Sequence, residues 1–98
     1  MSRIYLRDIG LKQEDMALLL AEDKRQIEKW GYQEHSAPEW VTIIAEEFGE
    51  LAHAISEYMH REGKLSDIEK EAVQVATLSL KIAVIIREAM SRDFRKGS

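Results

Sequence analysis

The sequence is poor in residues that crosslink a chain or interrupt a helix. Its 98 residues include no cysteine, one proline and five glycines. The missing cysteines exclude disulfides, thiolate metal sites and cysteine nucleophiles. They also agree with a reducing cytosol, so we expect a cytoplasmic protein. Because helix breakers are few and Ala, Leu, Ile, Glu and Lys are abundant, the composition predicts an all-α fold.

Long hydrophobic runs are also missing. The longest, VATLSLKIAVII from Val75 to Ile86, is too short to span a bilayer and contains Lys81. The first residues, MSRIYLRDIG, hold no apolar core of signal-peptide length. We therefore expect neither a membrane association nor a targeting segment.

The charge balance limits the kind of partner. The net charge is −4, and acidic and basic residues are mixed along the chain. A protein that binds duplex nucleic acid normally presents a basic face to the phosphates, so we expect no such partner. A small anionic ligand stays compatible with the sequence if a cation, such as a divalent metal, neutralises the carboxylates around it.

The hydrophobic pattern divides the chain into three helices within one domain, residues 1–98, because no linker is long enough to separate two domains. The helices are expected at about residues 14–30, 38–61 and 66–92. Two S-x-x-E spacings, Ser36 with Glu39 and Ser66 with Glu69, have the form of capping boxes. They predict where the second and third helices begin.

The third helix is apolar around most of its circumference. Its apolar positions are Ile68, Ala72, Val73, Val75, Ala76, Leu78, Leu80, Ile82, Ala83, Val84, Ile85 and Ile86. A helix that is apolar nearly all round has to be buried nearly all round, and two other helices of one small chain cannot easily do that. We therefore expect a homodimer or homotetramer in which helices from different copies complete a four-helix-type bundle.

Several acidic residues fall on apolar faces when the helices are drawn at about 100° per residue. In the stretch AEEFGELAHAI, Glu47 lies near the middle of the apolar arc, Glu50 at its edge and Glu46 just outside. On the third helix, Glu71 lies at the centre of the most apolar arc, and Gln74 follows one turn later on nearly the same face. A buried carboxylate is costly to ionise and needs a partner, a proton or a metal.

These side chains favour a metal site between two neighbouring antiparallel helices. The expected ligands are Glu47, Glu50, Glu71 and Gln74. Oxygen ligands that converge from facing helices suit a hard cation such as Mg²⁺, or Mn²⁺ in its place. The same faces offer few cationic side chains, so salt bridges explain three inward acids poorly. A structural polar cluster, in which Glu47 meets an Arg or Lys of another helix, is the alternative.

The order of these motifs resembles that of a known family. EEFGE, followed after a loop by EAVQ, resembles the E-E-x-x-E … E-x-x-D signature of the MazG-like, all-α nucleoside triphosphate pyrophosphohydrolases. The flanking stretches RQIEKWGYQEH and VATLSLKI are similar to the phage and bacterial MazG-like subgroup, so the resemblance covers about residues 23–86. It implies an enzyme that uses Mg²⁺ to convert a nucleoside triphosphate to nucleoside monophosphate and pyrophosphate.

The resemblance also implies roles for single residues. It makes Glu47, Glu50 and Glu71 magnesium ligands, and it makes Glu46 the acid that orients or deprotonates the attacking water. Gln74 stands where the family usually has Asp. An amide can coordinate Mg²⁺ through its oxygen, but it supplies no charge and cannot act as a base. The departure implies weaker metal binding, one metal fewer, or the alternative of a catalytically weak or inactive oligomeric protein that binds a nucleotide or a partner.

Four further residues are candidates for substrate binding. Lys29, Trp30 and His35 belong to the K-W-G-x-Q-x-H stretch of the resemblance. Trp30 would stack on a nucleobase or belong to the core, His35 would contact sugar or phosphate or lie in a solvated loop, and Lys29 would join the site or remain on the surface. Lys81 interrupts an apolar run on a side similar to that of Gln74, which makes it a phosphate contact or a lysine that snorkels from the core.

A rival metal pattern, E-x-x-H, occurs twice, at Glu50–His53 and at Glu57–His60. This spacing is typical of di-iron carboxylate bundles, which need such pairs on two different helices. Here both pairs lie on one helix, and the third helix has no histidine. We therefore expect both histidines to be surface residues.

Overall fold

The computed structural model describes residues 5–97, with side chains to residue 93, and residues 1–4 and 98 lie outside the described part. The protein is all-helical, as the sequence predicts, and residues 5–97 contain no strand. The elements are a short 3-10 helix, η1 (Gln13–Asp15), and three α-helices, α1 (Met16–Trp30), α2 (Ala37–His60) and α3 (Leu65–Gly97). In this part of the chain, no helix is long and apolar enough to cross a membrane.

Local sequence signals explain where α1 ends and α2 begins. Gly31 follows α1 with a φ of 74°, a left-handed conformation that favours glycine, and its N–H donates to the Ile27 carbonyl at 2.7 Å. The predicted capping box then opens α2. The Ser36 N–H donates to Glu39 Oε1 at 2.7 Å, and the Glu39 N–H donates to Ser36 Oγ at 3.4 Å.

The third helix differs from the prediction at both ends. It begins at Leu65, so Ser66 lies inside the first turn and not at the N-cap. It continues to Gly97, beyond the expected end near Arg92, because the tail RDFRK contains neither proline nor glycine to stop it. The result is one helix of 33 residues, which is about 50 Å long.

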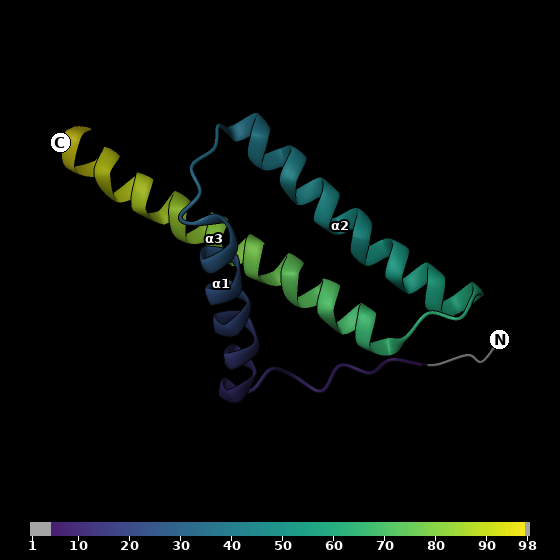
Figure 1. Ribbon diagram of the computed structural model, residues 1–98. Helices are drawn as coiled ribbons and strands as arrows, with labels where there is room; N and C mark the ends of the chain where they lie inside the picture. Colours follow the sequence, from purple (N-terminus) through teal and green to yellow (C-terminus); the bar gives the residue numbers. More distant parts are fainter. Residues whose placement is uncertain (1–4, 98) are drawn as a thin grey trace.

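Figure 1 shows α2 and α3 side by side in opposite directions, while α1 crosses α3 near the middle of its length. The turn that joins α2 to α3 is tight. The Gly63 N–H donates to the Glu57 carbonyl at 3.2 Å, and a Cβ on Gly63 would lie 2.6 Å from the Tyr58 backbone nitrogen. A side chain larger than glycine's would therefore force the turn apart, and this turn sets the register in which α2 meets α3.

The buried interior of the single chain is small. Among the described side chains, those with less than a tenth of their surface exposed are Ala54, Leu78, Gln26 and Thr77. The two polar ones lie at the junction of α1 and α3 and have hydrogen-bond partners. Thr77 Oγ1 donates to the Val73 carbonyl at 2.8 Å, and Gln26 bonds to side chains of both helices. The buried polar groups are therefore satisfied, and the bond between Gln26 and Lys81 joins the two helices.

The C-terminal half of α3, from its crossing with α1 onward, leaves apolar side chains exposed. Those with 40% to 60% of their surface exposed are Leu80, Val84, Ile85, Ile86 and Met90. The accessible surface of the chain is 8373 Å², whereas a compact protein of this mass exposes about 5,700 Å². One chain thus shows three helices with little shared interior, and the completion of a four-helix-type bundle by other copies stays a prediction.

Candidate metal centre

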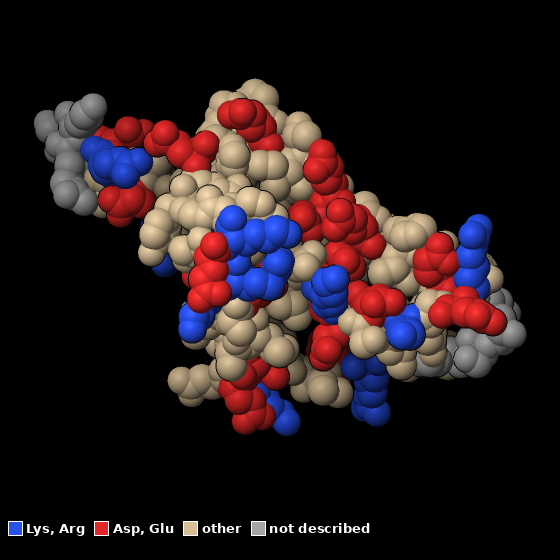
Figure 2. Space-filling model, viewed as in Figure 1, with Lys and Arg blue, Asp and Glu red and all other residues tan. Residues whose placement is uncertain are grey.

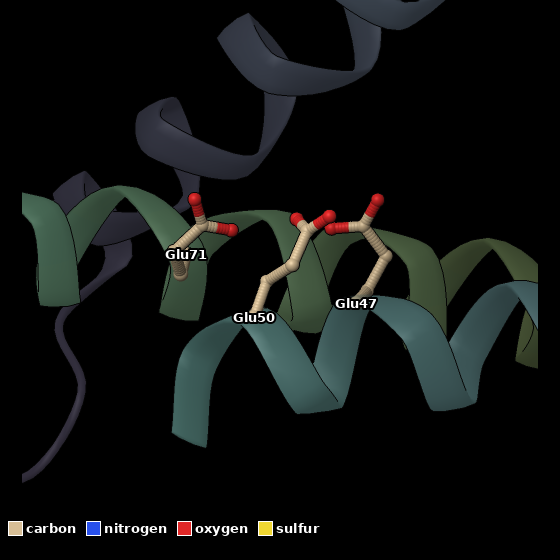
Figure 3. Close-up of side chains that lie close together, drawn as sticks. All are labelled: Glu47, Glu50 and Glu71. Carbon is tan, nitrogen blue, oxygen red and sulfur yellow. The ribbon is translucent and has the colours of Figure 1, made fainter. Parts of the chain in front are cut away.

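Acidic side chains from α2 and α3 converge on one side of this helix pair. Figure 2 shows acidic residues gathered over α2 and the neighbouring part of α3. Figure 3 shows Glu47 and Glu50 of α2 and Glu71 of α3 with their carboxylates pointing toward one another. One oxygen from each of the three carboxylates lies within 4.8 Å of the others. The structure therefore brings together the three acids that the helix faces predict.

Helix spacing and the register of α2 against α3 explain why these acids meet. Glu47 and Glu50 are one turn apart on α2 and so share a face. The Gly63 turn leaves Glu71, in the second turn of α3, beside them. Glu47 and Glu71 are half-buried, whereas Glu50 is exposed, so the cluster opens to solvent on the side of Glu50.

Burial and mutual repulsion raise the pKa of two of these acids. For Glu47, burial raises the pKa most, followed by the negative charges of Glu50 and Glu71. For Glu71, burial again raises the pKa most, followed by the charge of Glu50 and a side-chain hydrogen bond shared with it. Two carboxyl groups share a hydrogen bond only when one is protonated. The cluster therefore holds protons more tightly than separate glutamates do, and a cation among the acids would remove the repulsion.

An arginine of α1 lies near Glu47 but is paired with another residue. Arg25 donates from Nε to Glu22 Oε1 at 2.9 Å and from Nη2 to Glu22 Oε2 at 2.7 Å. Its charge lowers the pKa of Glu47, but less than burial and the neighbouring acids raise it. The salt bridges of the described residues include none of the three clustered acids. This arrangement does not favour the alternative of a salt-bridged structural cluster.

Gln74 contacts the acids through its amide nitrogen. With the nitrogen turned toward the cluster, Nε2 donates to Glu71 Oε2 at 3.0 Å and to Glu47 Oε2 at 3.2 Å. The opposite orientation places the amide oxygen against two carboxylates, and oxygen and nitrogen are assigned by this hydrogen-bond criterion. The sequence predicts an oxygen ligand at this position, whereas the hydrogen-bond assignment of the amide makes the group a donor there.

The donor atoms of the cluster fit a hard divalent cation. All are carboxylate oxygens, which suit Mg²⁺ and Mn²⁺, and burial together with the neighbouring acids raises the pKa of Glu47 and of Glu71. Glu46 lies outside the three-acid cluster. It is exposed and lines an open hollow of about 590 Å³ together with Glu50 and Glu71.

A second hollow, of about 380 Å³, adjoins the cluster and contains two of the predicted substrate-binding residues. Its lining consists of Gln26, Trp30, Gln33, His35, Ile43, Glu47, Gln74 and Leu78. Trp30 is 54% exposed, and Lys29 Nζ lies 4.6 Å from the centre of its ring. The His35 ring packs edge-on against Trp40, and its Nε2 lies 2.8 Å from Gln33 Oε1. Trp30 and His35 thus share a hollow with Glu47 and Gln74, and Lys29 stands at its margin.

The structure does not bring Lys81 to this cluster. Its Nζ donates to Gln26 Oε1 at 2.8 Å and lies 2.8 Å from Asp23 Oδ1. Lys81 lines a different hollow, a mostly apolar groove of about 400 Å³ between α1 and α3. Its observed contacts join these two helices, and a contact with phosphate stays a prediction.

Sequence reasoning missed the contribution of α1 to the surroundings of the site. The negative charge of Glu22 also raises the pKa of Glu47. Gln26 is 7% exposed, donates from Nε2 to Glu22 Oε2 at 2.8 Å and accepts from Lys81. The four-residue spacing of Glu22, Gln26 and Trp30 places them on one helix face, and that spacing was the available signal. His53 and His60 are exposed, as the sequence predicts.

Comparisons with protein-family models, with curated proteins and with solved structures give no match to this chain. The likeness to MazG-like proteins therefore rests on the motifs of the sequence.

Proposed function

We propose that this protein is a Mg²⁺-dependent nucleoside triphosphate pyrophosphohydrolase of the MazG-like type, which releases nucleoside monophosphate and pyrophosphate. The observation that carries the proposal is the convergence of Glu47, Glu50 and Glu71 from two antiparallel helices. The resemblance of EEFGE and EAVQ to the family signature supports it. The neighbouring hollow with Trp30 on its wall supplies a place for a nucleoside.

In this proposal, Glu47, Glu50 and Glu71 would hold Mg²⁺, or Mn²⁺ in its place. The bound cation would neutralise phosphate charge and make the attacked phosphorus more electrophilic. The three carboxylates come from packed helices, so the fold itself would hold them in position around the cation. Such preorganised charge is an effective way to stabilise a transition state.

Glu46 is the proposed proton acceptor. It lines the same hollow as Glu50 and Glu71 but is not part of the cluster, so its carboxylate is available to an attacking water. Water oxygen forms a bond to phosphorus, and the bond from phosphorus to the pyrophosphate oxygen breaks with its electron pair. The proton of the water passes to Glu46. No covalent nucleophile is needed, which agrees with the absence of cysteine.

The hollow beside the cluster would hold the nucleoside. More than half of the Trp30 surface is exposed, and a base would stack on the part of the ring that Lys29 and Arg25 do not cover. His35 lines the same hollow and would contact sugar or phosphate. Because Glu47 and Gln74 line the same hollow, a nucleoside here would have its phosphates within reach of the acids.

We further propose that the protein is a homodimer or homotetramer whose copies complete a four-helix-type bundle. The exposed apolar residues of the C-terminal half of α3 support this proposal. The accessible surface exceeds that of a compact chain by more than the roughly 800 Å² that one partner buries in a standard interface. A second copy would cover part of this excess.

A screen of canonical and modified nucleoside triphosphates for pyrophosphate release with Mg²⁺ tests the enzymatic proposal. We expect at least one substrate, release that stops with EDTA, and loss of release in Glu71→Gln. The absence of release from every triphosphate, by protein that is folded and oligomeric, would contradict the proposal. It would favour the alternative of an oligomeric protein that binds a nucleotide or a partner.

A further inference from the structure

Gln74 connects the two helices that carry the acidic residues. It lies one turn after Glu71 on α3 and is half-buried. Its amide nitrogen reaches Glu71 on its own helix and Glu47 on α2, at 3.0 and 3.2 Å. One neutral group thus bonds to an acid on each side of the helix pair.

The chemistry of the amide decides what these contacts can do. The NH₂ group offers two protons, and the two contacts use both of them. Hydrogen bonds from a neutral donor to a carboxylate are stronger than those between neutral groups. A carboxylate in the place of Gln74 would instead add a further negative charge to a cluster whose acids already repel one another.

We propose that Gln74 is a positioning residue that donates to Glu47 and Glu71 and holds them in place, and that it is not a metal ligand. The proposal rests on the metal site of the proposed function. Among the described residues, it assigns Glu47, Glu50 and Glu71 as the only protein ligands of the metal. The amide keeps the acids together when the metal is absent and keeps its two hydrogen bonds when the metal is present.

This role affects two properties differently, the stability of the cluster without metal and the affinity of the cluster for metal. Glu47 Oε2 and Glu71 Oε2 accept from the amide, and each keeps a second lone pair that can face a cation. The cation meets three carboxylates and no fourth charge, which weakens the attraction for a free metal ion. The site gains stability without metal and loses affinity for metal, so most of the affinity for Mg²⁺ has to come from phosphate oxygens of the substrate.

Two substitutions distinguish a positioning donor from an oxygen ligand. Gln74→Met keeps the approximate size of the side chain and removes both the donor and the oxygen. Gln74→Glu keeps the shape and replaces the donor with a charged oxygen. Gln13→Glu makes the same chemical change at an exposed position of η1 and serves as the control. The measurements are the Tm in EDTA and the dissociation constant of Mn²⁺ alone, read from free Mn²⁺ by electron paramagnetic resonance.

If Gln74 positions the acids, both variants lower the Tm in EDTA at neutral pH by about 3 °C or more, and Gln74→Glu has the larger effect. Gln74→Met leaves Mn²⁺ affinity within about twofold of the wild type, whereas Gln74→Glu tightens it about tenfold. Saturating Mn²⁺ then raises the Tm of Gln74→Glu above that of the wild type. A purely structural role would not produce this reversal. Gln13→Glu changes none of these values.

A tenfold loss of Mn²⁺ affinity in Gln74→Met would show that the amide oxygen is a ligand and would overturn the inference. An unchanged Tm in EDTA for both variants would overturn it as well. These readouts use no nucleotide, so they stay separate from the enzymatic proposal. A chain that binds Mn²⁺ as expected but hydrolyses nothing would keep this inference and refute the proposed function.

Discussion

The two halves of α3 are built in opposite ways. The N-terminal half packs against α2 and turns polar groups inward, among them Glu71, Gln74 and the buried Thr77. The C-terminal half turns apolar groups outward, and 51% of Ile86 and 60% of Met90 are exposed. Each half departs from the usual rule that polar groups face water and apolar groups do not. In the first half, neighbouring carboxylates repel one another, and in the second, apolar side chains lack a protein surface to cover them.

The role of the exposed apolar residues in the C-terminal half can be tested by changing both Val84 and Ile86 to Glu. We expect this double variant to have the largest effect, because two charges would enter an apolar interface. Association should weaken by about 4 kcal/mol, or roughly 1000-fold, and hydrolysis should fall with it. Sedimentation velocity across a concentration series measures the change. Arg87→Glu, at an exposed position of the same stretch that is already charged, is the control and should leave assembly intact. A wild type that sediments as a compact monomer at micromolar concentration would refute the assembly.

Glu46 lies on α2, which packs against the N-terminal half of α3. Glu46→Ala should remove catalysis without disturbing either half of α3. If Glu46 accepts the proton of the attacking water, turnover should fall on the order of 100-fold, while Mn²⁺ binding and oligomeric state stay unchanged. Pyrophosphate release under saturating Mg²⁺ measures turnover. Glu28→Ala, at an exposed position of α1, controls for loss of a carboxylate. Undiminished turnover in Glu46→Ala would remove that residue from the mechanism.

The burial of Glu71 and its repulsion by Glu50 predict a pH effect in Glu71→Gln. The pKa of Glu71 is raised above its ordinary value of 4.5, so above that pH the folded chain binds more protons than the unfolded chain. Stability is then lost as pH rises from about 4.5 through the raised pKa. In EDTA, Glu71→Gln should therefore melt about 2 to 5 °C above the wild type at about pH 7.5 and close to it at about pH 4.

Addition of Mg²⁺ to the same melts sharpens this prediction. The wild type should gain stability by mass action, because the cation binds the folded cluster, and Glu71→Gln should gain much less. Equal gains in the two proteins, or no gain in either, would count against a metal at these acids. A lower Tm of Glu71→Gln at both pH values would show that repulsion is not what destabilises the cluster.

The smallest effect is expected for Gln74→Asp, which restores the acid of the family signature. The charged oxygen should tighten Mg²⁺ binding and raise activity a few-fold when Mg²⁺ is limiting, since a fourth charge then faces the cation. Steady-state rates over a Mg²⁺ titration measure this. Lower activity at every Mg²⁺ concentration would indicate that the added charge repels the triphosphate more than it helps the metal.

The sequence predicted the features that depend on helical period. The faces of α2 and α3 follow from spacing alone, so the meeting of Glu47, Glu50 and Glu71 was predictable once the two helices were taken as antiparallel neighbours. The end of α3 was misjudged because the tail has no breaker before Gly97. Residue spacing also contains no information on how α1 crosses α3.

The partners of Lys81 depend on that crossing, so they could not be predicted from the sequence. Lys81 is on a side similar to that of Gln74, which made phosphate a reasonable expectation, but Asp23 and Gln26 of α1 meet it first. The orientation of the Gln74 amide was equally hidden, because Gln offers both an oxygen and a nitrogen. Only the two carboxylates around it decide which one faces inward.

The tight turn at Gly63 bears on which changes in chain length the protein can tolerate. The turn leaves only residues 61–64 between α2 and α3, and backbone atoms of α2 occupy the space next to Gly63. An inserted residue there would slide α3 along α2 and rotate its faces, so Glu71 would leave Glu50. Residues 31–36 join α1 to the N-terminus of α2, and an insertion there would leave the α2–α3 pairing unchanged. Homologous chains that keep the acidic cluster should therefore vary in length at the first connection and not at the second.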